Sequence, residues 1–159
     1  MQQGDIKSIE VANEILIPEI ISLLHENHTV TLRVKGYSMR PFLENERDNV
    51  LLTAQRPARI GDAVLAEIAP KRYVLHRLIR IDGMNATLLG DGNLTTEHCT
   101  LNDIHAIALG FYRKGRTTLD SCDGTKWKVY SFVWTHLFPI RRYLLGIYRR
   151  LIKYHLYKP

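Results

Sequence analysis

The sequence predicts a mainly β protein of the α+β class: an antiparallel β body with a short N-terminal helix and a C-terminal amphipathic helical tail. Between residues 29 and 113, apolar residues recur in short alternating runs separated by turn residues, whereas outside this region they recur every three or four positions. The first period is typical of half-buried strands and the second of amphipathic helices. With 45% hydrophobic and 24% charged residues among 159, the composition is that of a globular protein with a core.

The elements follow from these patterns in chain order. Residues 8–26 predict a helix, or two helical turns broken near Pro18, because proline removes a backbone donor inside a helix. Residues 29–35 alternate strictly and predict the first strand. Short connections without helices then favour an antiparallel sandwich or barrel-like sheet. Further strands are expected at residues 49–54, 62–68, 72–81, 86–89 and 104–113.

Helical periodicity returns after Gly124, with a break expected at Phe138 and Pro139. The last helix has an apolar face and a basic face. The apolar face holds Ile140, Tyr143, Leu144, Ile147, Tyr148, Leu151 and His155, and the basic face holds Arg141, Arg142, Arg149, Arg150 and Lys153. We therefore divide the chain into an N-terminal helical segment (1–27), a β domain (28–125) and a basic helical tail (126–159).

The net charge of +6 is concentrated in this tail. Residues 126–159 contain eight Lys/Arg and no Asp or Glu, so residues 1–125 contain 14 basic and 16 acidic side chains. The tail either packs on the body with its basic residues in water, or lies on an anionic membrane surface with those residues facing lipid. Nucleic acid is not an expected partner, because too few residues precede the first strand for a helix-turn-helix module.

No signal peptide, spanning helix, metal or cofactor is expected. The first residues lack a cationic start followed by an apolar run, and the longest nearly apolar stretch, residues 129–140, is shorter than the roughly 18 residues that a spanning helix needs. Cys99 and Cys122 lack metal-ligand spacing and are expected as free thiols of a cytoplasmic protein.

One constellation suggests nucleophilic catalysis. Ser38 follows the first strand, between a glycine that allows close backbone approach and a proline that stiffens the exit. His76 lies in an otherwise apolar row of a later strand, and a neutral imidazole there can accept the serine proton. Asp91, in the turn after the next strand, is a candidate to orient the ring.

Five short motifs in this order resemble the signal peptidase and LexA-type clan of serine peptidases. The resemblance spans roughly residues 29–113. The motifs are Gly-x-Ser-Met-x-Pro at 36–41, Asp-Asn-Val at 48–50, Gly-Asp-Ala-Val-Leu at 61–65, Val-Leu-His-Arg-Leu-Ile at 74–79 and Gly-Asp-Gly-Asn at 90–93.

The resemblance implies the fold of that clan and assigns roles to individual residues. Ser38 matches the nucleophile, and His76 matches the base position, which is lysine in bacterial signal peptidases and LexA-type proteins but histidine in the endoplasmic-reticulum type and its bacterial relatives. Asp91 matches the region of the acid, with Asp103 as a second candidate. The oxyanion and binding positions fall on Gly36, Tyr37, Met39 and Pro41.

Two departures shape the expected function. Gly36 stands where many signal peptidases have a serine that helps to bind the oxyanion, so backbone N–H groups would form the oxyanion hole. The clan's membrane anchor is also not recognisable in this sequence. We expect a bacterial serine endopeptidase with a Ser38/His76 dyad that cleaves a peptide or protein precursor from the cytoplasmic side. The alternative is a catalytically silent module of the same fold that binds a peptide or a membrane.

Overall fold

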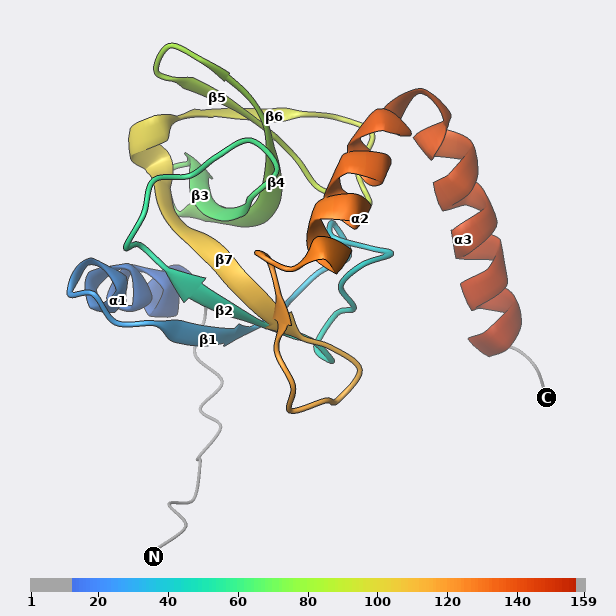
Figure 1. Cartoon of the computed structure of the whole chain (residues 1–159), viewed down its shortest axis with the longest axis horizontal. Helices are drawn as coiled ribbons and strands as arrows, with labels where there is room; N and C mark the ends of the chain where they lie inside the picture. Colours follow the sequence, from blue (N-terminus) through green and yellow to red (C-terminus); the bar gives the residue numbers. More distant parts are fainter. Residues whose placement is uncertain (1–12, 157–159) are drawn as a thin grey trace, which may run out of the picture.

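The structure, a computed structural model, describes the backbone of residues 13–156 and the side chains of residues 16–153. Residues 8–12 of the predicted N-terminal helix and the side chain of His155 lie outside the described part. The chain forms an α+β fold, as predicted, with an eight-stranded antiparallel sheet and helices at both ends (Figure 1).

The strands are β1 (Val30–Arg33), β2 (Asn49–Thr53), β3 (Ala63–Ala69), β4 (Arg72–Asp82), β5 (Asn85–Leu89), β6 (Glu97–Thr100), β7 (Ile104–Tyr112) and β8 (Asp120–Ser121). The helices are α1 (Asn13–His25), α2 (Thr125–His136) and α3 (Arg141–Leu156), with short 3-10 turns η1 (Leu101–Asp103) and η2 (Phe138–Ile140). The order of strands in the sheet is β1-β2-β7-β3-β4-β5-β6, and β8 pairs with β7.

The long strand β7 joins the two halves of the sheet. Its first half pairs with β3, where Leu65 lies opposite Ala106, and its second half pairs with β2, where Val50 lies opposite Phe111. The register shifts by a bulge in both pairings, and bulges increase the twist of a sheet. The sheet therefore coils. Two apolar clusters form, a large one with residues of α1, β1, β2 and α2, and a smaller one with residues of β3, β4, β5 and β7.

An aromatic cluster fixes α2 to the body. The ring of Phe42, from the segment between β1 and β2, lies 4.8 Å from the Trp127 ring of α2 and 5.3 Å from the Phe111 ring of β7. Trp134 is also buried, so the face of α2 that holds Trp127 and Trp134 is covered by the body. Helix α3 lies on the outer side of α2, away from the sheet (Figure 1). Aromatic side chains bury large areas and give this contact much of its stability.

Most element boundaries agree with the sequence-based expectation. The six expected strands are present, and the expected break between two C-terminal helices falls at η2. Helix α1 is continuous through Pro18, so the alternative of two broken turns is wrong for the described residues. Strands β6 and β8 were not expected. Within residues 13–156, no helix has both the length and the apolar character needed to cross a bilayer.

Candidate active site

Ser38 lies in an irregular segment between β1 and β2 whose apolar side chains are buried in the core. Met39, Phe42 and Leu43 are buried in the large apolar cluster, which leaves Ser38 half-buried at the surface. Gly36 adopts a left-handed backbone, with φ of 91°, and donates its N–H to the Oδ1 of Asn45 at 2.7 Å. A glycine is needed at this position because a side chain strains that conformation.

Asp48 closes the base of the same segment. Its buried carboxylate accepts hydrogen bonds from the backbone N–H groups of Glu44 and Lys114, both at 2.9 Å, and from the Arg47 guanidinium. Burial raises the pKa of the Asp48 carboxyl, but the hydrogen bonds to the carboxylate lower it by more. The pKa is therefore below its usual range. The serine is therefore presented by a loop whose ends are tied together.

The turn after β5 supports Ser38 from the other side. Gly92 donates its N–H to the Ser38 carbonyl at 2.7 Å. A Cβ placed on Gly90 would lie 2.5 Å from that same carbonyl oxygen and 3.0 Å from Nε2 of His76. The Ser38 carbonyl and Nε2 of His76 therefore both lie next to Gly90, and no hydrogen bond joins the Ser38 hydroxyl to His76 among residues 16–153. Any side chain at Gly90 would push the two apart.

His76 is held on its other nitrogen by Glu97. Nδ1 of the buried ring lies 2.5 Å from Oε2 of Glu97 as a close ion-pair contact, and neither atom forms a hydrogen bond of ordinary geometry among residues 16–153. The second oxygen of Glu97 accepts a hydrogen bond from Arg72 at 3.1 Å, which orients the carboxylate. Burial lowers the pKa of His76, and the Glu97 carboxylate opposes that lowering. The ring is thus kept largely neutral at neutral pH, as a general base requires.

Asp91, which the sequence suggested as the acid, lies near His76, but its carboxylate is hydrogen-bonded to other residues. Its two oxygens accept hydrogen bonds from Arg77 at 2.9 and 2.8 Å, and Oδ2 also accepts one from the Tyr130 hydroxyl at 3.0 Å. The indole N–H of Trp134 donates to the Asp91 carbonyl at 3.0 Å. Asp91 and Arg77 form a buried ion pair that joins β4 and the Ser38-supporting turn to α2.

The second acid candidate also makes other contacts. Asp103 accepts hydrogen bonds at 2.7 Å from both the backbone N–H and the hydroxyl of Thr100, and so caps η1. These bonds keep the pKa of Asp103 below its usual range. Among the described residues, Glu97 is the carboxylate that contacts the His76 ring.

The expected oxyanion and binding residues differ in their accessibility. Tyr37 is exposed beside Ser38, with the Arg40 guanidinium 4.1 Å from the centre of its ring. Pro41 is half-buried and follows a cis peptide bond, whereas Met39 is fully in the core. The Gly36 N–H is already used by Asn45. None of the hydrogen bonds among residues 16–153 uses the N–H of Ser38 or of Met39, so these two groups can serve an oxyanion.

The sequence suggested five membrane-facing basic residues, and one of these assignments is wrong. Arg141 is only 1% exposed, because its guanidinium turns inward against the rings of Trp134 and Phe138 and donates to the Trp134 carbonyl at 2.7 Å. The reason is its position at the first turn of α3, where the helix folds back on α2. The other four are exposed: Arg142, Arg149, Arg150 and Lys153.

Glu97 is the site residue that sequence reasoning missed. It lies in β6, whose four residues, Glu-His-Cys-Thr, contain no run of β-branched or aromatic side chains. In the structure, β6 alternates between half-buried and exposed side chains, and Glu97 and Cys99 face inward. This alternation appears only in the burial of the side chains, and the sequence of the four residues contains no signal for a strand.

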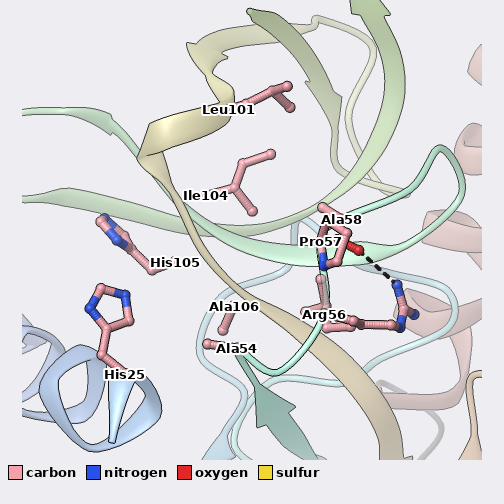
Figure 2. Close-up of a pocket in the computed structure, with 10 residues that line it drawn as sticks. His25, Ala54, Arg56, Pro57, Ala58, Leu101, Ile104, His105 and Ala106 are labelled. Atoms are coloured by element: carbon pink, nitrogen blue, oxygen red, sulfur yellow. Dashed lines mark hydrogen bonds between the residues drawn. The ribbon is translucent and has the colours of Figure 1, made fainter. Parts of the chain in front are cut away.

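A cavity of about 300 Å³ lies away from this site (Figure 2). The imidazole rings of His25 from α1 and His105 from β7 face each other at one end, 6.4 Å apart between centres. Arg56 lies at the other end, where its guanidinium donates to the Pro57 carbonyl. The described residues contain no group of three or more His, Cys, Asp or Glu side chains placed to bind a metal ion.

No family model, curated protein or solved structure matches the chain in the comparisons made with each of the three. The chemistry of the site is therefore argued from its own residues.

Proposed function

We propose that the protein is a serine endopeptidase in which Ser38 is the nucleophile, His76 the general base and Glu97 the carboxylate that orients the base. The observation that supports this most directly is the placement of the two nitrogens of His76. Nδ1 lies 2.5 Å from the Glu97 carboxylate, and Nε2 lies beside Gly90, which also adjoins the Ser38 carbonyl. A serine, a histidine and a carboxylate gathered at one place are the groups from which serine hydrolases build their catalytic unit, which supports the proposal.

The proposed reaction begins with proton transfer to His76. Nε2 accepts the hydroxyl proton of Ser38 while Oγ attacks the carbonyl carbon of a peptide bond, and the carbonyl electrons move to its oxygen. The resulting oxyanion accepts hydrogen bonds from backbone N–H groups, for which those of Ser38 and Met39 are suited. Glu97 keeps the proton on Nδ1 and stabilises the imidazolium as it forms.

The second half reverses the proton transfer. As the tetrahedral intermediate collapses, Nε2 donates its proton to the leaving amine, and the acyl group remains on Oγ of Ser38. Neutral His76 then takes a proton from water, whose oxygen attacks the ester carbon. Collapse of this intermediate returns a proton to Oγ and releases the new carboxyl end of the substrate.

The fold and location proposed for this enzyme follow the same reasoning. The order of motifs along the chain and the coiled antiparallel sheet with the serine in the segment after β1 support a fold of the signal peptidase and LexA type. Cys99 and Cys122 are both free thiols in the structure, which supports action in the reducing cytoplasm. The proposed substrate is a peptide or protein precursor bound in extended form.

A fluorophosphonate probe tests the proposal. The purified protein should be labelled on Ser38, as located by mass spectrometry of the modified peptide, and the labelling rate of His76→Ala should fall by at least about a hundredfold. Ser38→Ala is the matched negative control. Folding of each variant is checked by its circular dichroism spectrum and its thermal unfolding transition. Equal labelling of the wild type and of a folded His76→Ala variant would exclude His76 as the base.

The same experiment separates the enzyme from a silent binding module. A folded protein that remains unlabelled at Ser38 over a hundredfold range of probe concentration is a binding module rather than a hydrolase.

A further inference from the structure

The outward face of α3 has an apolar stripe with nothing packed on it in the described chain. Tyr143, Ile147 and Leu151 are 70%, 58% and 56% exposed, and they follow one another at intervals of four residues. Residues four apart lie above one another on a helix. Phe138 and Ile140, in the turn that leads into α3, are also about half exposed.

This stripe is not the surface by which α3 is attached to the body. Leu145 is buried, and Tyr148 is half-buried on the side of the helix that faces the protein. Burial raises the pKa of Tyr148, and the nearby carboxylate of Glu44 raises it further. Helix α3 therefore turns one apolar side toward the protein, at Leu145 and Tyr148, and a second apolar side outward.

Basic residues border the stripe. At about 3.6 residues per turn, Arg150 comes next to Tyr143 around the helix, and Lys153 follows beyond Arg150 on the same side. These two residues, like Arg142 and Arg149, are exposed and form no ion pair within residues 16–153. From residue 126 to the end, the chain contains eight Lys/Arg and no Asp or Glu.

We propose that this face of α3 docks on an anionic membrane surface, lying in the plane of the interface. A helix with an exposed apolar stripe, aromatic residues and an adjoining row of unpaired cations fits a lipid surface of negative charge. The absence of any acidic residue in the last 34 positions gives charge complementarity to anionic headgroups over the whole segment.

Docking in this way would hold the candidate active site near the membrane. The docking face lies on the opposite side of α3 from Leu145 and Tyr148, so docking would tether the body to the surface through this helix. Substrates would then be segments of membrane-bound proteins near the interface. This last step depends on the proposed peptidase function, whereas lipid binding itself does not.

Vesicle flotation tests the docking directly. The full-length protein is mixed with vesicles of equal parts phosphatidylglycerol and phosphatidylcholine, and separately with phosphatidylcholine alone. The protein should float with the anionic vesicles and bind the neutral ones at least tenfold more weakly. The double variant Ile147→Asp/Leu151→Asp should reduce binding to anionic vesicles at least tenfold, as should the triple variant Arg149→Gln/Arg150→Gln/Lys153→Gln.

A matched control uses an apolar residue of similar exposure elsewhere. Ile60 is 63% exposed in the turn before β3, and Ile60→Asp should bind anionic vesicles like the wild type. All variants are first shown to keep the wild-type circular dichroism spectrum.

Equal binding of wild type and of the Ile147→Asp/Leu151→Asp variant would overturn the proposal. A wild-type dimer in light scattering that this variant abolishes, together with no flotation, would also overturn it by showing that a second copy covers the stripe. Loss of labelling at Ser38 with flotation intact would reject the peptidase function and leave the docking proposal standing.

Discussion

Nδ1 of His76 and Oε2 of Glu97 lie 2.5 Å apart, and they join two strands, β4 and β6, that are not neighbours in the sheet. The contact forms because the coiled sheet brings β6 over β3 and the start of β4. A carboxylate at this position fixes the tautomer of the ring and so decides which nitrogen is free to accept a proton. This is the relationship that the proposed role of His76 as general base requires.

Replacement of Glu97 is expected to reduce the activity strongly. In Glu97→Gln, the amide cannot stabilise the imidazolium, so we predict that kcat/KM, or the rate of probe labelling, falls by about 10²- to 10⁴-fold. Because the carboxylate is what raises the pKa of His76 against burial, its removal should also shift the acid limb of the rate profile to lower pH. The measurement is the labelling rate between pH 4.5 and 8.

Asp103→Asn serves as the control for this prediction. Asp103 was the alternative acid, and it caps η1 without contacting His76. The variant should lose about 0.5–2 kcal/mol of stability while its labelling rate stays within about threefold of the wild type. The opposite pattern, with Asp103→Asn inactive and Glu97→Gln active, would assign the orienting role to Asp103.

Gly90→Ala should damage both the fold and the activity. The added Cβ would meet the Ser38 carbonyl at 2.5 Å and the His76 ring at 3.0 Å, so one or both must move. We expect a loss of about 1–3 kcal/mol, as for overpacking of a core, and a labelling rate at least tenfold lower. Urea unfolding and probe labelling provide the two measurements.

The matched control for Gly90→Ala is Gly146→Ala. Gly146 is exposed in α3, and an added Cβ would meet no atom within 4 Å. Alanine in a helix interior stabilises by about 0.5–1 kcal/mol relative to glycine. If both variants changed the labelling rate equally, the close approach at Gly90 would not explain the effect.

The sequence predicts the positions of Ser38 and His76 relative to the strands better than it predicts the residues that contact them. Strong alternation marks β1 and β4, so the serine could be placed after one strand and the histidine within another. Asp91 was misleading because a Gly-Asp-Gly-Asn turn is common to many folds, and only the three-dimensional packing shows its carboxylate paired with Arg77. Glu97 lies in a short polar strand that gains its structure from its pairing with β5, which local sequence does not encode.

The membrane-facing assignment of Arg141 failed for a related reason. Helical periodicity describes one helix in isolation, and it correctly separates the basic from the apolar positions of α3. It does not show where a neighbouring helix will lie. The turn at η2 brings the first residue of α3 against the end of α2, and this contact buries the guanidinium.

Breaking the Arg77–Asp91 pair should be the most destabilising of the single changes considered. Both side chains are about 1% exposed, and removal of one partner leaves the other charge buried without compensation, which costs about 3–5 kcal/mol. We expect this loss for Asp91→Asn, measured as the free energy of unfolding in urea. Tyr130→Phe removes one hydrogen bond to the same carboxylate and should lose about 1.5–3 kcal/mol. A loss below about 1 kcal/mol in Asp91→Asn would contradict a structural role for this pair.

Stability should fall as the pH decreases from about 6.5, the ordinary pKa of histidine. Burial lowers the pKa of both His76 and His105 in the folded protein. Between the lowered pKa and the ordinary one, the unfolded chain binds more protons than the folded chain, so acid favours unfolding. Above about pH 7, both states are neutral at these rings and the effect vanishes. Urea unfolding between pH 5 and 8 measures this slope, and His105→Gln should reduce it without removing it. An unchanged free energy of unfolding across this range would show that neither ring resists protonation.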